Sequence, residues 1–251
     1  MIRIGHIDFI NMIPLDLYHS NGLSYTKIPG PPTLINRMLL QGEVDVGVIS
    51  VAFYLQHKKD LLRLGKFGIL SDGPVLSVML FSKINLAEAS GKGVLKIFET
   101  PKSATSVFLN RLILREVYSL RTLPVATRGE AEAVLLIGND ALLERVKGAW
   151  PYQYDLGEEW KNWTGLPMVF AVLATSRGIY QRKEEELKRY VEILEENYRH
   201  SLLDKNGLVV RAKEMAPLAE DLLHKYFHCL QYEIGPREEE AIALFERLTG
   251  C

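Results

Sequence analysis

The sequence has 251 residues, of which 47% are hydrophobic and 24% are charged, with 30 Lys and Arg residues against 31 Asp and Glu residues. This is the composition of an ordinary globular protein, so it excludes the disordered, collagen-like and low-complexity classes. The formal net charge of -1 gives no global field that would hold a polyanion. We therefore expect no nucleic acid partner.

Targeting and redox signals are weak. The longest apolar runs, such as 133–138 and 75–81, fall far short of the roughly 20 residues of a membrane span, so we expect no membrane partner. Met1 is followed at once by Ile-Arg-Ile-Gly, which is unlike a signal peptide and predicts a cytoplasmic protein. Cys229 and Cys251 are too few for a disulfide framework or a zinc ligand set, so we expect free thiols.

The first part of the chain alternates strands and helices. Residues 2–5 and 24–28 are predicted strands, and a helix follows from Pro31-Pro32 to Gly42. Residues 44–49 are rich in Val and Ile and predict a buried strand. This β-α-β alternation predicts a mostly parallel sheet with helices on both faces.

The remainder predicts a second set of α/β units and a helical end. Residues 75–82 form a predicted strand long enough to run from one lobe into another, and 168–175 form a second one that carries the chain back. Between them we predict strands at 96–98, 123–126 and 133–137, and helices at 104–118 and 141–146. Everything after 175 is predicted to be helical, at 184–200, 213–227 and 238–248.

These elements predict an α/β clamshell of two lobes joined by two crossing strands. Lobe 1 is expected to be discontinuous, comprising 1–80 and 170–251, and lobe 2 to comprise 81–169, with the ligand cleft between them. The sequence predicts no oligomeric state.

Common catalytic motifs are missing from the sequence. There is no glycine-rich nucleotide loop, no H-E-x-x-H, no paired C-x-x-C and no G-x-S-x-G. His224, His228 and Cys229 come nearest to a metal site, but they lack a fourth ligand at a fitting spacing and fit a solvated helix face better. We therefore expect no metal and no nucleotide cofactor.

Polar residues that follow strands are the candidates for ligand contact, because ligands of open α/β sheets bind beyond the carboxyl ends of the strands. Asn11 stands in an apolar loop before Pro14, where it would either bind a ligand or cap a helix. Ser50 ends a strand, and we expect it to cap the following helix, to contact a ligand, or to do both. Ser77 is the polar residue of an apolar crossing strand, facing the cleft or bonded to a backbone carbonyl.

Hydroxyl groups also cluster where a helix begins at 103–106, which reads Ser-Ala-Thr-Ser. Helix N-termini present unpaired N–H groups and the positive end of the helix dipole, which suit a carboxylate or a phosphate. Capping needs only one of these hydroxyls, so the surplus favours anion binding by this turn.

Together these segments resemble one family, the chorismate dehydratases of the futalosine route to menaquinone. Residues 159–167 read Glu-Trp-Lys-Asn-Trp-Thr-Gly-Leu-Pro, which is the most specific match. Residues 10–14, Ser77, 103–106 and 137–140 match the family pattern in the expected order, and the similarity extends from Arg3 to Phe245.

The resemblance implies a fold like that of the type II periplasmic binding proteins. It implies removal of water from chorismate to give 3-[(1-carboxyvinyl)oxy]benzoate, without a cofactor. Asn11 and Ser77 are then expected to be catalytic, and we hypothesise that the side-chain carboxylate of the substrate takes the ring proton, with Asp140 as a second candidate base. The residues expected to bind substrate are Ser50, Ser103, Thr105, Ser106, Asn139, Met168 and Phe170. Two alternatives stay open: 1,4-dihydroxy-6-naphthoate synthase of the same pathway, and a cytoplasmic small-anion-binding protein of the same fold.

Overall fold

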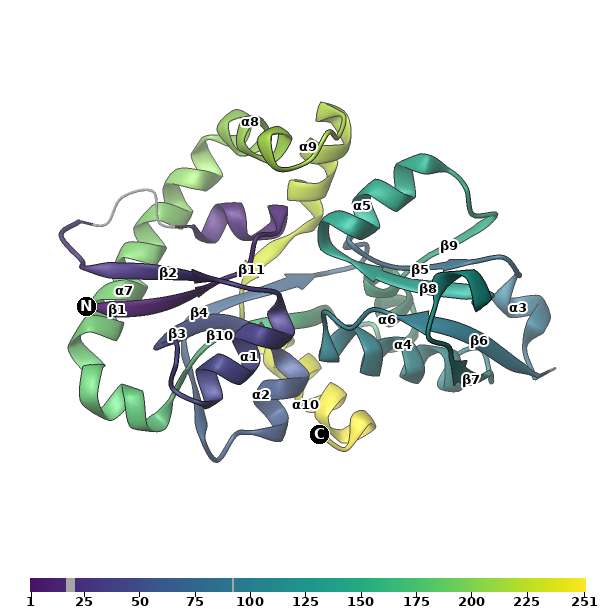
Figure 1. The fold of residues 1–251 in the computed structure, drawn as a ribbon, viewed down its shortest axis with the longest axis horizontal. Coiled ribbons are helices and arrows are strands. Elements are labelled where there is room, and N and C mark those ends of the chain that lie inside the picture. The colour runs from purple at the N-terminus through teal and green to yellow at the C-terminus, as the bar shows by residue number, and fades with distance from the viewer. Residues whose placement is uncertain (17–20, 92) are drawn as a thin grey trace.

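Two β-sheets lie side by side in the molecule, each covered by helices, which gives two lobes (Figure 1). The structure is a computed structural model that describes residues 1–16, 21–91 and 93–251. Lobe 1 is built on a six-stranded sheet and lobe 2 on a five-stranded sheet. The α/β class with two lobes, predicted from the alternation of elements, is confirmed.

Lobe 1 contains both ends of the chain. Its sheet has the strand order β11 (Gln231–Glu233), β4 (Leu61–Ser71), β10 (Met168–Ser176), β3 (Val46–Ser50), β1 (Ile2–His6) and β2 (Tyr25–Pro29). Four helices pack against this sheet: α1 (Pro32–Leu40), α2 (Val51–Gln56), α7 (Arg177–Leu203) and α10 (Pro236–Thr249). The 3-10 helix η1 (Ile10–Leu15) contacts α7 and α8 (Lys205–Met215), and α8 in turn contacts α9 (Glu220–Cys229).

Lobe 2 is formed by the middle of the chain. Its sheet has the strand order β7 (Arg121–Pro124), β6 (Val94–Glu99), β8 (Ala133–Ile137), β5 (Val78–Ser82) and β9 (Tyr152–Asp155). Helices α4 (Ala104–Glu116), α5 (Gly138–Lys147) and α6 (Leu156–Thr164) pack against it. The short helices α3 (Leu86–Ala89) and η2 (Arg128–Glu130) lie in its connections.

Both sheets are mixed, which corrects the prediction of mostly parallel sheets. Strand β1 pairs in parallel with β2 and β3, but β10 is antiparallel to both β3 and β4. In lobe 2, β6 pairs in parallel with β7 and β8, while β5 is antiparallel to β8 and β9. The reason is that β5 and β10 each enter their sheet from the other lobe, at the end where the neighbouring strands leave.

The chain crosses twice between the lobes, but not within strands. The two strands expected to cross each belong to one sheet: β5 pairs in the lobe 2 sheet and β10 pairs in the lobe 1 sheet. The lobe boundaries predicted at 80/81 and 169/170 therefore fall inside these strands. The links are residues 72–77 and 165–167 instead. Gly73 and Leu76 have φ angles of 115° and 61°, and Pro74 has no N–H to donate, so this link cannot continue a strand.

The C-terminal segment is helical, as predicted, with two differences. The helix expected at 213–227 is two helices, α8 and α9, because Pro217 offers no N–H and Ala216 before it is extended, with φ -155° and ψ 142°. The strand β11 then pairs with β4. Strand β4 itself escaped prediction because charged residues and Gly65, with φ 58°, interrupt its apolar pattern.

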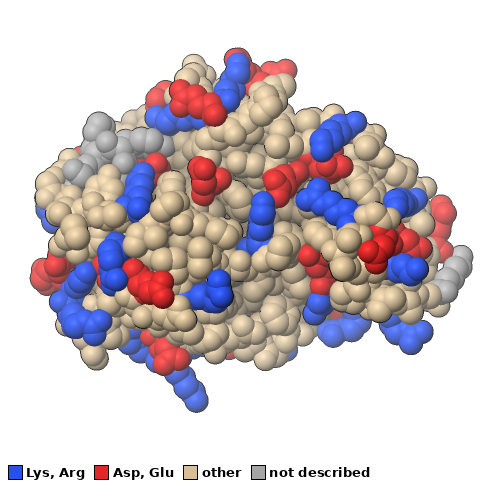
Figure 2. Space-filling model, viewed as in Figure 1, with Lys and Arg blue, Asp and Glu red and all other residues tan. Residues whose placement is uncertain are grey.

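Most buried apolar side chains form one large cluster that includes residues of both sheets, and a second, smaller cluster in lobe 2 contains Met79, Phe81, Ala131, Val134, Leu136 and Ala141. Basic and acidic side chains are interspersed across the face of the molecule shown in Figure 2. Among the residues described, no helix combines the length and the apolar character needed to cross a bilayer.

Candidate functional site

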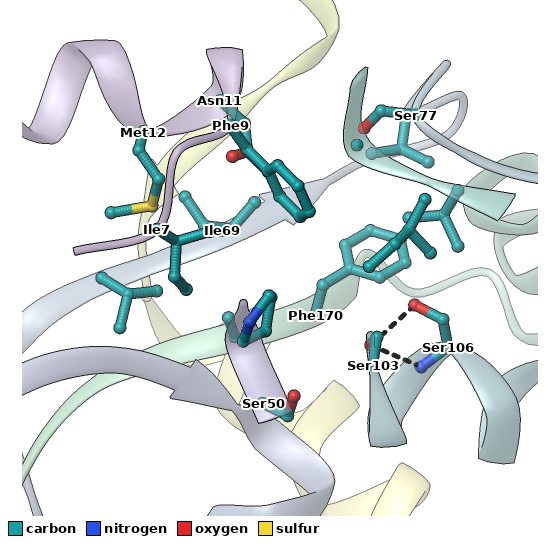
Figure 3. A pocket seen from close by; sticks show the side chains of 17 residues that line it. Ile7, Phe9, Asn11, Met12, Ser50, Ile69, Ser77, Ser103, Ser106 and Phe170 are labelled. Carbon is teal, nitrogen blue, oxygen red and sulfur yellow. Dashed lines mark hydrogen bonds between the residues drawn. The ribbon is translucent and has the colours of Figure 1, made fainter. Parts of the chain in front are cut away.

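A pocket lies where the two lobes meet. Lobe 1 and lobe 2 both contribute to its wall (Figure 3). The lining consists of Ile7, Phe9, Asn11, Met12, Pro32, Val48, Ser50, Ile69, Val75, Ser77, Val78, Ser103, Ser106, Ile137, Gly138, Phe170 and Ala171. Six of the predicted site residues, drawn from five separate segments of the chain, are thereby brought together: Asn11, Ser50, Ser77, Ser103, Ser106 and Phe170.

The lining carries polar groups but no ionisable side chain among the residues described. Its side-chain polarity comes from one amide and four hydroxyls, set among aliphatic and aromatic groups. Asn11 and Ser77 lie on one side of the pocket and Ser50, Ser103 and Ser106 on the other, in the view of Figure 3. The pocket therefore offers neutral hydrogen-bonding groups at two opposite walls.

Asn11 has an unused acceptor. It follows β1 in η1, and its backbone carbonyl accepts a hydrogen bond from the Tyr232 hydroxyl at 3.0 Å. Its side-chain Oδ1 is buried without a hydrogen-bond partner in the described part of the chain. Buried polar atoms are nearly always paired, so this oxygen is poised for a ligand that donates a hydrogen bond. Asn11 also does not cap η1, whose N-cap is Phe9.

Ser77 is hydrogen-bonded to a buried tyrosine of the C-terminal segment. Its side chain is almost completely buried, and its Oγ accepts a hydrogen bond from the hydroxyl of Tyr226 on α9 at 2.9 Å. Its backbone carbonyl accepts from the N–H of Gly138 at 2.8 Å. The alternative of a bond from the Ser77 hydroxyl to a backbone carbonyl is not what the structure shows.

The link that carries Ser77 is fixed by a carboxylate. Asp155 accepts hydrogen bonds from the backbone N–H groups of Val75 at 3.0 Å and Leu76 at 2.7 Å. The same carboxylate caps α6 through Gly157 N at 3.0 Å and Glu158 N at 3.3 Å. Burial raises the pKa of Asp155, while the four backbone donors oppose that rise. Asp155 thus ties the crossing link to lobe 2.

Helix starts surround the lobe 2 side of the pocket. Ser103 is the N-cap of α4 and accepts from Ser106 N at 3.2 Å, while the two serine Oγ atoms lie 3.0 Å apart. Helix α5 begins at Gly138 on the pocket wall and has no side-chain cap. The positive ends of two helix dipoles therefore lie close to the pocket, which favours an anionic ligand.

Three of the expected substrate-binding residues are not in the lining. Met168 is buried in β10. Thr105 is fully buried, and its Oγ1 accepts from the N–H of Ala52 in α2 at 3.2 Å. Asn139 Oδ1 accepts from the N–H of Ile10 in η1 at 3.1 Å. Thr105 and Asn139 therefore connect the lobes beside the pocket.

Gly138 is one point where the two lobes approach closely. Its φ is 57°, and a Cβ there would lie 2.9 Å from the ring of Phe9 in lobe 1. Glycine is therefore required both by the backbone and by the close approach of the lobes. Asp140, considered as a base, does not line the pocket and forms an ion pair with Lys102 at 2.6 Å.

Metal-binding clusters are missing from the part of the chain that the structure describes: no three His, Cys, Asp or Glu side chains lie together as ligands. His224 and His228 are exposed on α9, as predicted for a solvated face.

Tyr226 was missed by the sequence reasoning. Its signal is present, because Tyr226 falls three residues after Leu223 on the apolar stripe of its helix, where a hydroxyl needs a buried partner. The apolar residues around Asn11, such as Phe9 and Met12, were also missed and could have been inferred from their proximity in sequence.

Comparison with known proteins defines the family. A family model described as menaquinone biosynthesis matches residues 2–250. The chain belongs to this menaquinone biosynthesis family. It is 33% identical to a chorismate dehydratase of Thermus thermophilus, with 98% of this chain and 94% of the relative covered. It is 23% identical to a 1,4-dihydroxy-6-naphthoate synthase of the same organism, with 89% of this chain and 84% of that relative covered.

The fold is also found among solved structures. The periplasmic aliphatic sulphonate binding protein SsuA of Escherichia coli superposes with a TM-score of 0.70 at 13% identity, covering 99% of this chain and 85% of that protein. The family member therefore has the fold of periplasmic binding proteins, as the sequence resemblance implied.

Proposed function

We propose that the protein is a chorismate dehydratase, a carbon–oxygen lyase that removes water from chorismate to give 3-[(1-carboxyvinyl)oxy]benzoate. The family match and the 33% identical dehydratase support this function. We place the reaction in the futalosine route to menaquinone and in the cytoplasm, as suits a biosynthetic enzyme of this family. The reaction involves no net oxidation or reduction, so it requires no redox cofactor.

The observation that carries this function is a pocket whose described lining is uncharged and sets one amide and four hydroxyls among apolar groups. Chorismate is a dianion, and a pocket bordered by helix starts and hydroxyl groups suits carboxylates. An ionised protein carboxylate in the wall would repel it. We assign the ring carboxylate to Ser103 and Ser106, and the side-chain carboxylate to the neighbourhood of Ser50.

Among the residues that the structure describes, the lining offers no side chain that would act as a general base at neutral pH. The side-chain carboxylate of the substrate therefore accepts the proton from ring carbon 3. The electron pair of that C–H bond enters the ring and completes its aromatic system. The C4–O bond breaks with its electron pair on oxygen, and the departing hydroxyl takes up the proton to leave as water.

Asn11 and Ser77 act on this step by positioning. The orphan Oδ1 of Asn11 accepts a hydrogen bond from the substrate hydroxyl, and the hydroxyl of Ser77 donates to the oxygen that leaves. A preorganised donor such as Ser77 stabilises negative charge as it develops on the departing oxygen, while the Asn11 acceptor orients the substrate hydroxyl. The lobes exclude water, which would otherwise compete for the same hydrogen bonds.

Two other functions fit the fold, namely 1,4-dihydroxy-6-naphthoate synthase and a small-anion-binding protein. The naphthoate synthase relative is 23% identical, against 33% for the dehydratase. A single experiment separates the three. Purified protein is incubated with chorismate and, separately, with cyclic dehypoxanthine futalosine, and the products are followed by ultraviolet absorbance and mass spectrometry.

A dehydratase converts chorismate to an aromatic product lighter by one water and leaves the futalosine derivative unchanged. Conversion of the futalosine derivative alone would identify the synthase. Binding of chorismate without conversion would identify a binding protein.

A further inference from the structure

Tyr226 lies behind the pocket wall and is not part of the lining. It is fully buried in α9, in the C-terminal segment of lobe 1, and its hydroxyl reaches Ser77 Oγ at 2.9 Å. Ser77 stands at the end of the link into lobe 2, 149 positions away in sequence. This contact joins the C-terminal segment to a residue that faces the substrate.

The direction of this hydrogen bond follows from burial. Ser77 Oγ is the hydrogen-bond partner of the Tyr226 hydroxyl among residues 1–16, 21–91 and 93–251, and water cannot reach a phenol that is fully buried. If Ser77 donated to Tyr226, the phenol proton would be buried and unpaired, which is costly. Tyr226 therefore donates, and Ser77 accepts.

A serine hydroxyl has one proton and two acceptor lone pairs. With one lone pair used by Tyr226, the Ser77 proton remains available on the side of the pocket. Burial also raises the pKa of the Tyr226 phenol, so it keeps its proton and stays a donor throughout the neutral range. The serine cannot turn its proton towards Tyr226 without losing this bond.

We propose that Tyr226 is a positioning residue, which makes Ser77 a hydrogen-bond donor towards the reacting oxygen of the substrate. This deepens the dehydratase function and rests on it, because the role of Ser77 was assigned there. Without the phenol, the Ser77 hydroxyl is free to rotate, and only a fraction of its orientations would point the proton at the substrate.

The test is a double-mutant cycle on the full chain, with kcat and KM for chorismate and thermal unfolding measured on the same preparations. Tyr226→Phe should lower kcat about tenfold, the equivalent of one hydrogen bond, with KM changed less than about twofold. In the Ser77→Ala background the same change should lower kcat by less than about twofold, because the serine on which it acts is gone. Tyr118→Phe is the matched control: it removes a tyrosine hydroxyl bonded to Glu159 in lobe 2, and kcat should stay normal.

An equal loss of kcat in both backgrounds would overturn the inference, and so would a normal kcat in Tyr226→Phe. If the wild-type protein leaves chorismate unchanged, the proposed function is refuted. The hydrogen bond between Tyr226 and Ser77 is then tested by thermal unfolding of the same variants. Ser77→Ala strands a buried phenol, so it should lower the melting temperature by about 2–4 °C or more. Adding Tyr226→Phe removes the unpaired hydroxyl and should restore part of the lost melting temperature. A further decrease in melting temperature would show that the Tyr226 hydroxyl does not depend on Ser77.

Discussion

Among single residues, Asn11 and Ser77 are the two that the proposed chemistry needs, and their surroundings differ. The sequence places both in apolar segments and leaves their partners open. Within the described ranges, the structure shows a buried Asn11 oxygen without a hydrogen-bond partner and a Ser77 oxygen bonded to Tyr226. The difference depends on a contact between positions far apart in the chain, which no local pattern contains.

We expect Asn11→Ala to lower kcat by roughly 10²–10³, the loss of one transition-state hydrogen bond in a closed site. Its melting temperature should change little, because its side-chain oxygen holds no partner in the described structure. Ser77→Ala should lose a similar factor of roughly 10²–10³ in kcat, and should also lose about 1–3 kcal/mol of stability from the stranded phenol. Turnover and thermal unfolding on the same samples check both results. Normal turnover in both variants would refute the mechanism.

At the scale of elements, two residues predicted to bind substrate, Asn139 and Thr105, form contacts between the lobes. The N-caps of η1 and α2, Phe9 and Ser50, form no side-chain cap hydrogen bond, and side chains from the other lobe supply acceptors instead: Asn139 for η1 and Thr105 for α2. From the sequence, a threonine at a helix start is predicted either to cap its own helix or to contact a bound ligand. Its partner N–H is 53 positions away, so the contact between lobes could not be predicted.

Thr105→Val should therefore weaken the closed arrangement. The substitution keeps the shape of the side chain but leaves the buried N–H of Ala52 unpaired, and we expect KM for chorismate to rise about tenfold with a smaller change in kcat. Thr164→Val is the matched control, because Thr164 also accepts a backbone N–H, from Leu166, but not across the lobes. Steady-state kinetics on both variants measure this. An equal rise in KM for the two would contradict a role for Thr105 in closure.

Other elements show what periodicity does and does not reveal. The break between α8 and α9 was readable from Pro217, and the prediction of one helix there failed because its apolar stripe was given more weight than the proline. Strand β4 was not readable, because its central position in a sheet follows from pairing with β10 and β11.

In the whole molecule, the alternation of elements predicted two lobes, since each α/β set needs its own sheet. It did not predict the contacts that hold the N-terminal strand to helix α7. Asp45 is fully buried beside β3 and accepts hydrogen bonds from Arg3 Nη2 at 2.7 Å and Lys183 Nζ at 2.8 Å. This group joins the N-terminal strand to α7 at Lys183, where the helix is kinked, with φ -134° and ψ 32°.

Asp45 should make stability depend on pH. Burial alone would raise the pKa of its carboxyl, but the hydrogen bonds from Arg3 and Lys183 outweigh it and hold the pKa below the ordinary value. A lowered pKa in the folded state gives a contribution that is complete above the unfolded pKa of about 4 and is lost as the pH falls below it. Asp45→Asn should reduce the free energy of unfolding at pH 7 by about 1.5–3 kcal/mol. As the pH decreases, the free energy of unfolding of this variant should fall less steeply than that of the wild type.

Urea unfolding across a pH series measures this dependence. Glu195→Gln is the control, because Glu195 is paired with Arg199 on the exposed side of α7, away from Asp45, and its curve should follow the wild type. A curve for Asp45→Asn that runs parallel to the wild type down to the acid limit would show that Asp45 does not carry the effect.

The central claim is that a pocket without an ionisable side chain dehydrates chorismate, with the substrate supplying the base. The most direct measurement is kcat for chorismate from about pH 5 to about pH 9, a range in which both substrate carboxylates stay ionised. Because the described residues of the pocket wall include no titrating group, kcat should stay level across this range. A rise or a bell-shaped profile with a pKa inside it would reveal a protein acid or base, and no turnover at any pH would refute the function itself.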